Sequence, residues 1–324
     1  MLLILSESGD RTTDEVLQWL LAWGVCFLRI NTDDAVEIVD VSPSSDHLII
    51  KAKGGTYNLA DFDRVWFRRG VLSLRCFVEA VEYATAHHDA RNVVRFIQAE
   101  WDRLREYIFF CLERKDALGS FSRYNLNKLS VLHLAKECGL DIPETLVSED
   151  ARQLAAMAAR GQLITKPISE AYAFGRPGGP LLKMLTTTAT AADWRLPIFP
   201  SLVQERLDKW VELRVVYLCG RCYTGAIFSQ NDAKTAVDYR NYGGTENRIV
   251  PFALPIEVSQ KIDLLMGKLN LDMGSIDMVL TRDMRYVFLE VNPVGNIEMV
   301  SKPCNYPIER EIAKILSNAN KNTA

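Results

Sequence analysis

Two apolar stretches near the C-terminus, SIDMVL and YVFLEVN, contain acidic and amide residues where a buried strand normally has apolar ones. They predict two antiparallel strands joined by a turn at residues 282–285. Because side chains alternate between the faces of a strand, Glu290 and Asn292 point the same way, and antiparallel pairing can place Asp277 beside them. Two carboxylates and an amide oxygen are ligands that Mg²⁺ prefers. The alternative is that these acidic residues lie on the hairpin without a function. Their position within a buried apolar segment favours a metal site.

A lysine lies inside the apolar segment LITKP, which predicts another strand. The charge of Lys166 in such a segment needs an anionic partner. A nucleotide phosphate is one candidate partner, and a carboxylate of the protein is the other. The segment alone leaves both open.

The segment SLVQERLDKWVELRVVYL predicts two strands joined by a short polar linker. Gln204 and Glu205 end the first strand, and Glu212 and Arg214 lie at the start of the second. Backbone groups of such a linker can bind adenine. Glu212 can bind ribose hydroxyls, and Arg214 can contact a phosphate or an acyl intermediate.

The N-terminal part of the chain predicts an α/β lobe. Residues 2–5 and 25–31 predict buried strands, and residues 14–23 between them have the apolar spacing of a helix. Thr12 and Glu15 form a capping-box pair at the start of that helix. A strand, a helix and a strand in thirty residues indicate a βαβ unit.

The rest of the chain divides at a polar break over residues 119–127. Before it, apolar and aromatic residues at spacings of three and four predict a long helical stretch over residues 77–114. After it, further helices are predicted over residues 128–138, 256–269 and 306–318. We expect an N-terminal α/β domain with a long helix (1–118), a central subdomain (119–195) and a C-terminal subdomain with the magnesium site (196–324).

Composition excludes several classes of function. The 324 residues include 38 basic and 41 acidic ones, a net charge of −3 that argues against general affinity for nucleic acid or membranes. No segment approaches the ~20 apolar residues of a membrane span. The first residues, MLLILSESGD, are typical of a strand and not of a signal peptide. We therefore expect a cytoplasmic protein.

Seven scattered cysteines, an odd number, indicate reduced thiols. Cys219 and Cys222 form a CxxC pair, which is either a redox motif or a hairpin with its turn at Gly220-Arg221. The apolar runs on both sides favour the hairpin. None of the four histidines has a metal-ligand spacing, so we expect no zinc site.

The order of these motifs resembles that of the ATP-grasp ligases. The segments VWFRRG, EWDRLREYIFF, NLNKL, LITKPISE, FSQND, DYRNY, GSIDMVL and LEVNPVGN follow the order of the grasp-with-spasm peptide maturases, which are graspetide (microviridin-type) synthetases. The resemblance spans nearly the whole chain. It implies an α/β (α+β) ATP-grasp fold, in which an N-terminal α/β lobe accompanies central and C-terminal lobes that sandwich ATP.

The resemblance also implies roles for individual residues. The ATP-binding residues would be Lys128, Lys166, Gln204, Glu205, Leu207, Glu212 and Arg214. Two Mg²⁺ ions would be bound by Asp277, Glu290 and Asn292. The residues that act on the transferring phosphoryl group would be Lys166, Arg214 and Arg240. Candidate residues on the substrate side are Arg68, Arg69, Asp232, Arg240 and Asn241.

Two of these points have alternatives. Arg68 and Arg69 suit an acidic peptide, but they equally fit a solvated strand end. The segment ISEAYAFGRPGGP after Lys166 is longer than the compact glycine-rich loop of many ATP-grasp enzymes and carries two prolines. We expect residues 167–183 to form a lid that keeps water from the reaction.

The implied reaction is ATP-dependent and forms ADP through an acyl-phosphate intermediate. In the family, Glu or Asp side chains of a precursor peptide are coupled to Thr or Ser hydroxyls, or to Lys amines, giving macrocyclic ω-esters or ω-amides. The implied partner is a ribosomal precursor peptide with a leader and an acidic, Thr-rich core, and we expect a homodimer. The alternatives are a carboxylate-amine ligase like the ribosomal-protein glutamate ligase or glutathione synthetase, and a nucleotide-binding regulator without turnover.

Overall fold

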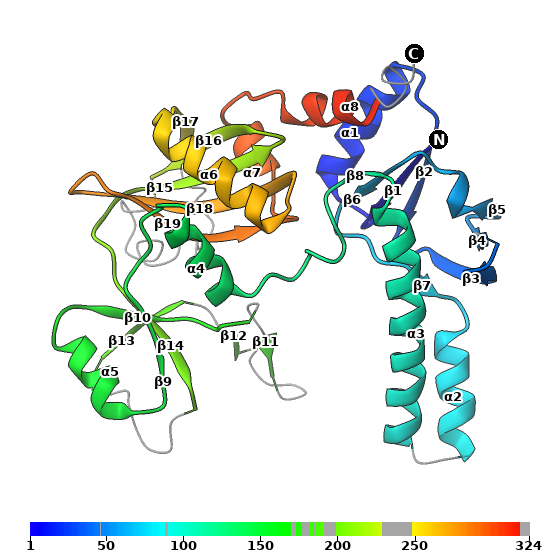
Figure 1. The fold of residues 1–324 in the computed structure, drawn as a ribbon, viewed down its shortest axis with the longest axis horizontal. Helices are drawn as coiled ribbons and strands as arrows, with labels where there is room; N and C mark the ends of the chain where they lie inside the picture. Colours follow the sequence, from blue (N-terminus) through cyan, green and yellow to red (C-terminus); the bar gives the residue numbers. More distant parts are fainter. Residues whose placement is uncertain are drawn as a thin grey trace. The chain divides into compact units, whose positions relative to one another are not determined.

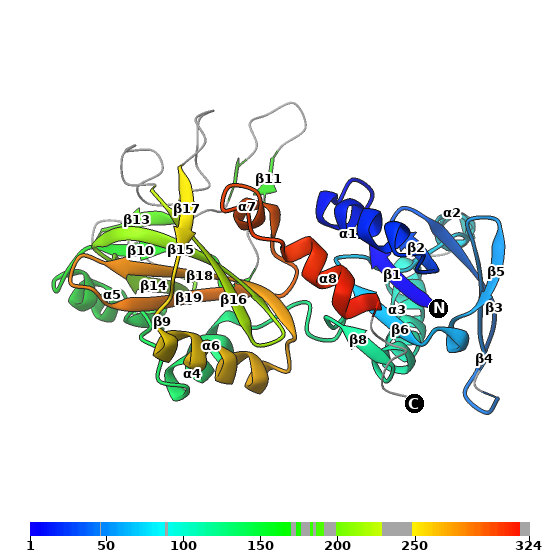
Figure 2. The same cartoon turned by 90° about the horizontal axis from the view of Figure 1, so that it is seen from above.

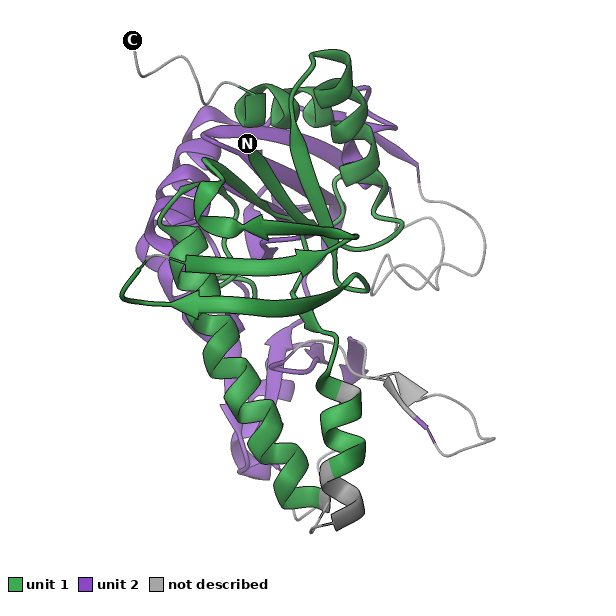
Figure 3. Cartoon of the chain, turned by 90° about the vertical axis from the view of Figure 1, so that its right-hand side faces the viewer, with its two compact units in different colours: residues 1–124, 296–298, 307–324 green, residues 125–295, 299–306 purple. Residues whose placement is uncertain are grey.

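A computed structural model describes residues 1–45, 47–87, 90–169, 173–175, 182–183, 186–190, 199–228 and 248–317. The chain forms two compact units (Figure 3). Unit 1 comprises residues 1–124, 296–298 and 307–324, and unit 2 comprises residues 125–295 and 299–306. The boundary after residue 124 falls inside the polar break at 119–127, and the finer division into three lobes stays a prediction.

Unit 1 is built on a parallel sheet of four strands in the order β2-β1-β6-β8 (Figure 1). Its strands are β1 (Leu2–Ser6), β2 (Phe27–Asn31), β6 (Arg64–Phe67) and β8 (Asp116–Leu118). Helix α1 (Arg11–Ala22) connects β1 to β2, so the expected βαβ unit is confirmed. The N-cap of α1 is Asp10, whose side chain accepts a hydrogen bond from the backbone N–H of Thr13. The helix therefore begins earlier than the capping-box pair Thr12 and Glu15 predicted.

The remaining elements of unit 1 are a second sheet and helices. The sheet has the order β5-β4-β3-β7, with strands β3 (Ala35–Ser42), β4 (His47–Ala52), β5 (Gly55–Asn58) and β7 (Ser73–Leu74). The helical elements are the 3₁₀ turn η1 (Leu59–Asp61), α2 (Phe77–His87), α3 (Ala90–Glu113) and α8 (Ile308–Ser317). The single stretch predicted over residues 77–114 is thus two helices, which lie side by side (Figures 1 and 3). The segment TAHHDARN between them lacks glycine and proline, so it carries no strong signal for a break between helices.

Unit 2 contains an antiparallel sheet of five strands in the order β17-β16-β15-β18-β19. The strands are β15 (Lys209–Leu218), β16 (Arg221–Ile227), β17 (Ile249–Phe252), β18 (Met273–Thr281) and β19 (Tyr286–Asn292). Helices α4 (Lys128–Glu137) and α6 (Ile256–Leu269) cover one face (Figure 2). On that face Leu213, Ile276 and Phe288 pack in one core with Ile262 and Met266 of α6. Alternation along the strands turns other residues to the opposite face.

A second antiparallel sheet of unit 2 has the order β13-β10-β14-β9. Its strands are β9 (Thr145–Ser148), β10 (Leu163–Thr165), β13 (Thr187–Ala189) and β14 (Ser201–Glu205), and helix α5 (Ala151–Ala158) packs on it. The short strands β11 (Ala173–Phe174) and β12 (Leu182–Lys183) pair with each other. The last short helix is α7 (Glu298–Ser301). No helix in the described part of the chain is long and apolar enough to cross a membrane.

The CxxC segment forms a tight hairpin. β15 ends at Leu218 and β16 begins at Arg221, so the turn is Cys219-Gly220, one residue before the predicted position. Both turn residues have positive φ, 45° and 84°, as in a type I′ hairpin turn. All seven cysteines are free, and burial raises the pKa of the Cys222 thiol to about 11. A raised thiol pKa opposes redox chemistry, which favours the structural interpretation.

The turn after β6 requires glycine at position 70. A Cβ added at Gly70 would lie 2.1 Å from the backbone nitrogen of Ser6, because the turn packs against the end of β1. We predict that Gly70→Ala lowers the free energy of unfolding by about 2 kcal/mol or more. Gly267→Ala is the matched control, since its Cβ meets nothing within 4 Å and alanine favours helix α6 by up to about 1 kcal/mol. Urea denaturation measures both, and equal stabilities for the two variants would contradict the packing of this turn.

Candidate functional site

The pairing of β18 with β19 brings the predicted metal ligands to one face of the five-stranded sheet. Asp277 lies directly opposite Glu290, and Ser275 lies directly opposite Asn292. Directly paired residues point to the same side of an antiparallel sheet, so both carboxylates and the amide share a face. This face is opposite to the one that packs against α4 and α6.

A β-bulge makes this arrangement possible. The register shifts between Asp277 and Met278, because Met278 pairs with Phe288 and Leu289 has no partner on β18. Without the extra residue, Glu290 would share the core-facing side of Phe288, two positions earlier. The bulge turns Glu290 to the polar face while Phe288 stays in the core.

The neighbouring strand β15 adds two charged residues to the same face. Arg214 is directly paired with Asp277, and Glu212 is directly paired with Val279. Both Glu212 and Arg214 are buried. The Nζ of Lys209 lies 3.2 Å from a carboxylate oxygen of Glu212, and the side chain of Lys209 is also largely buried. Sequence reasoning missed Lys209 because a lysine at the first position of a strand looks like an ordinary solvated end.

Each carboxylate of the predicted metal site lies beside a cation. Arg214 donates a hydrogen bond to Asp277, and the side chains of both are about nine-tenths buried. The Nζ of Lys128 is 4.0 Å from a carboxylate oxygen of Glu290 and donates to the carbonyl of Ser169 at 2.8 Å. The structure therefore brings Lys128 and Arg214, both predicted to bind ATP, to the predicted metal ligands.

A tight turn holds Asn292 at the end of β19. Its side-chain oxygen accepts the N–H of Val294 at 3.0 Å, and its carbonyl accepts the N–H of Gly295 at 3.2 Å. A Cβ at Gly295 would lie 2.3 Å from the Cβ of Ser275, so the turn packs closely on β18. The amide oxygen has a second lone pair, which keeps it able to bind a metal.

The predicted nucleotide-binding residues of the central sheet lie on β14, on β10 and in the linker to β15. Gln204 is buried and donates to Thr145 at 2.9 Å, and Glu205 accepts the N–H of Glu144 at 3.0 Å. The side chain of Glu205 thus ties the end of β14 to the residue before β9. Leu207 is half-buried in the linker. Lys166 is half-buried and follows the end of β10, so it lies just outside the strand in which the sequence placed it.

The donor set on this face fits Mg²⁺. It offers two carboxylates and one amide oxygen, which are hard oxygen ligands that leave room for water and nucleotide phosphates. Among the described residues no group of three or more His, Cys, Asp or Glu side chains could hold a metal. A magnesium ion held by these oxygens would take the rest of its coordination from water and nucleotide phosphates, as is usual for Mg²⁺ in phosphate-transfer sites.

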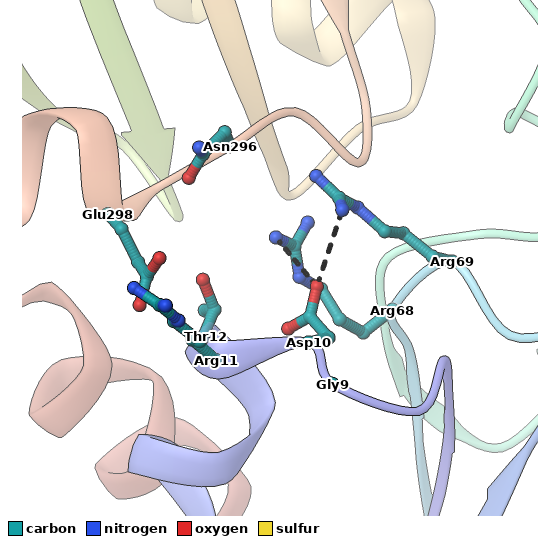
Figure 4. A pocket seen from close by; sticks show the side chains of 8 residues that line it. All are labelled: Gly9, Asp10, Arg11, Thr12, Arg68, Arg69, Asn296 and Glu298. Carbon is teal, nitrogen blue, oxygen red and sulfur yellow. Dashed lines mark ion pairs between the residues drawn. The ribbon is translucent and has the colours of Figure 1, made fainter.

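Several predicted residues lie elsewhere. Asp232, Arg240, Asn241 and most of the predicted lid at residues 167–183 fall outside the described residues. Arg68 and Arg69 belong to unit 1. Arg68 is only 1% exposed, and its guanidinium lies 3.4 Å from a carboxylate oxygen of Asp10 (Figure 4). The alternative interpretation of Arg68 as a solvated residue at a strand end is therefore wrong. Sequence reasoning missed Asp10, although its place between a strand and a helix is a usual one for ligand-binding residues.

Comparisons with known proteins identify the fold. No protein-family model matches the chain, and no curated protein matches it. Among solved structures, the macrocyclase MdnC of Microcystis aeruginosa MRC, bound with the precursor peptide MdnA, is 25% identical with a TM-score of 0.79, over 98% of this chain and 99% of MdnC.

Two further solved structures are similar over nearly the whole chain. A RiPP-associated ATP-grasp ligase of Chryseobacterium gregarium, in complex with ADP, a leader and a core peptide, is 22% identical with a TM-score of 0.80, over 98% of this chain and 95% of that one. The ATP-grasp ligase PsnB, complexed with a minimal precursor, Mg and ADP, is 19% identical with a TM-score of 0.72, over 98% and 96% of the two chains. This chain therefore has the fold of the ATP-grasp ligases, in the form found in enzymes of RiPP biosynthesis.

Proposed function

We propose that this chain is an ATP-dependent ligase that joins side chains within a ribosomally made precursor peptide. Glu or Asp carboxylates are activated as acyl phosphates and bonded to Thr or Ser hydroxyls, giving macrocyclic ω-esters, or to Lys amines, giving ω-amides. The observation that carries the proposal is the sheet face on which Glu212, Arg214, Asp277 and Glu290 lie together. The similarity to a peptide-bound macrocyclase along the whole chain supports a peptide as the substrate.

In the first step a carboxylate oxygen of the peptide attacks the γ-phosphorus of ATP, the bond to the bridging oxygen breaks, and ADP leaves. Lys128 and Lys166 hold the phosphates, and Glu212 binds the ribose. Asp277, Glu290 and Asn292 would hold Mg²⁺, which would neutralise part of the phosphate charge. The protein contributes position and electrostatics and needs no nucleophile of its own.

Arg214 is suited to the transferring phosphoryl group. Its guanidinium is fixed by Asp277 on the same wall as the metal ligands. A guanidinium has five N–H donors in a planar fork, and this fork matches phosphate and carboxylate oxygens. A buried, oriented charge of this kind stabilises a developing negative charge without further rearrangement.

In the second step a hydroxyl oxygen of the peptide attacks the acyl carbon, phosphate leaves, and the hydroxyl proton passes to solvent. The peptide loses one water for each bond formed. Water must be kept from the acyl phosphate, and the lid proposed for residues 167–183 would serve this purpose. Arg240 is proposed to act on the phosphoryl group, and Asp232 and Asn241 on the substrate, as the resemblance implies.

The finer parts of the proposal rest on the resemblance. They are two Mg²⁺ ions, a precursor with a leader and an acidic, Thr-rich core, a homodimer, a cytoplasmic setting and the three-lobe division of the chain. A leader that docks away from the reacting groups would raise the local concentration of the core.

Co-expression with a precursor tests the proposed reaction. Short reading frames beside the gene that encode acidic, Thr-rich peptides are expressed with the protein, and the peptides are weighed by mass spectrometry. We expect the peptide mass to fall by one water for each bond formed. If the bonds are esters, hydrolysis at high pH should restore the original mass. A mass gain on a target would instead indicate an amino-acid ligase. Unchanged masses for all such peptides would contradict macrocyclisation.

The metal ligands have their own test. Glu290→Gln and Asn292→Ala should each lower coupling by about 10²-fold or more, as for other preorganised charge-stabilising groups. Calorimetry of ADP binding with and without Mg²⁺ should show that Glu290→Gln removes the magnesium-dependent gain in affinity. Glu257→Gln is the matched control, because Glu257 is an exposed residue of α6. Near-normal coupling in both variants would refute the assignment.

A further inference from the structure

The polar face of the five-stranded sheet contains an ion pair that the sequence did not predict. The Nζ of Lys209 donates a hydrogen bond of 3.2 Å to a carboxylate oxygen of Glu212. The side chain of Lys209 is 13% exposed, and that of Glu212 is 8% exposed. Both residues belong to β15 of unit 2, and Glu212 is the residue proposed to bind the ribose. Lys209 itself takes no part in the two proposed steps.

A β-bulge turns Lys209 to this face. Lys209 is directly paired with Thr281 of β18, and the next paired residue of β15 is Val211, so Trp210 is an extra residue between them. Val211 packs in the core with helices α4 and α6. In a regular strand Lys209 would point to the same side as Val211, because side chains two positions apart share a face. The extra residue turns Lys209 to the opposite, polar face.

The backbone around Lys209 is held by the turn between β18 and β19. The carbonyl of Asp208 accepts the N–H of Arg282 at 3.0 Å, and the side chains of these two residues form an ion pair of 3.3 Å. The hydroxyl of Thr281, which is the partner of Lys209, accepts the N–H of Arg285 at 2.9 Å. These bonds fix the backbone from which the Lys209 side chain extends.

The charged residues of β15 follow one another in the order of the parts of a nucleotide. Lys209, Glu212 and Arg214 lie on the polar face, from the linker toward the metal ligands. At about 3.3 Å per residue, Lys209 and Arg214 are on the order of 15 Å apart along the strand. With adenine at the linker, ribose at Glu212 and phosphates near Arg214, Lys209 lies on the ribose side of the proposed site.

A fixed carboxylate suits a ribose. A carboxylate accepts hydrogen bonds, and both ribose hydroxyls can donate them. A buried carboxylate such as that of Glu212 needs a cation beside it. A glutamate side chain also loses rotamer freedom when it is held in one orientation. An ion pair that already holds the side chain removes this cost from the binding of the nucleotide.

We propose that Lys209 is a positioning residue, which holds the carboxylate of Glu212 for the ribose hydroxyls and so gives the site a preference for ribonucleotides. This inference rests on the proposed function, because it takes ATP as the nucleotide and Glu212 as its ribose ligand. The alternative role for Lys209 is a direct contact with a phosphate. Such a contact would act equally on nucleotides with and without ribose hydroxyls, whereas a positioning residue acts only through the hydroxyls.

Calorimetry with two nucleotides tests the inference without any reaction. ADP and 2′,3′-dideoxy-ADP, which differ only in the two hydroxyls, are each titrated with Mg²⁺ into the full chain. We expect the unmodified protein to bind ADP about 10-fold or more tightly, as hydrogen bonds to a charged group require. Lys209→Met should weaken ADP about 10-fold and leave dideoxy-ADP nearly unchanged. Lys209→Arg keeps the charge and should recover most of the affinity for ADP.

A double variant keeps the test valid if Lys209→Met alone is unstable. Lys209→Met leaves a buried carboxylate without this cation, which costs stability. Lys209→Met combined with Glu212→Gln removes both charges, and it should bind ADP as Glu212→Gln alone does, because Lys209 acts through Glu212. Lys268→Met is the matched control, since it removes the same charge from an exposed pair with Glu137 and should bind both nucleotides like the unmodified protein. Melting temperatures show whether each variant is folded.

Three results would overturn the inference. They are equal weakening of both nucleotides by folded Lys209→Met, weaker ADP binding by the double variant than by Glu212→Gln alone, and no recovery by folded Lys209→Arg. The unmodified protein separates this inference from the proposed function. If it binds neither nucleotide, the proposed ligase function fails and the inference fails with it. If it binds ADP with Mg²⁺ but the Lys209 variants affect both nucleotides equally, only the inference fails.

Discussion

The candidate active site depends on one irregularity, the β-bulge at Leu289. The bulge lets Phe288 stay in the core while Glu290, two residues later, turns to the opposite face beside Asp277. A regular strand would bury the carboxylate of Glu290 against α4 and α6, where it would lack a partner. β-Bulges are commonly placed next to active sites, where they re-aim a side chain.

The charges on this face balance before a nucleotide is bound. Arg214 neutralises Asp277, and Lys128 lies 4.0 Å from Glu290. Buried carboxylates without such partners would be strongly destabilising. The same cations suit phosphate oxygens, so a magnesium nucleotide would exchange one set of ion pairs for another. Under the proposed function, Lys128 and Arg214 would therefore contribute to stability as well as to nucleotide binding.

Much of this site could be predicted from the sequence, because it depends on how side chains alternate between the two faces of a strand. The spacing of Glu290 and Asn292 on one strand gives their shared direction, and the strand pattern gives the hairpin. The bulge could not be predicted, since Leu289 is apolar like its neighbours. The burial of Arg68 and its pairing with Asp10 depend on contacts between distant segments, and neither has a local signal in the sequence. The βαβ unit was predictable from periodicity, whereas the division of residues 77–114 into two helices was not.

The central claim is that this face of the five-stranded sheet binds a magnesium nucleotide. Crystals grown with ADP and Mn²⁺ in place of Mg²⁺ test it directly, because anomalous scattering locates the metal. The account predicts an anomalous peak in contact with oxygens of Asp277 and Glu290, next to the phosphates of the nucleotide. Bound ADP with its metal held by other residues would contradict it.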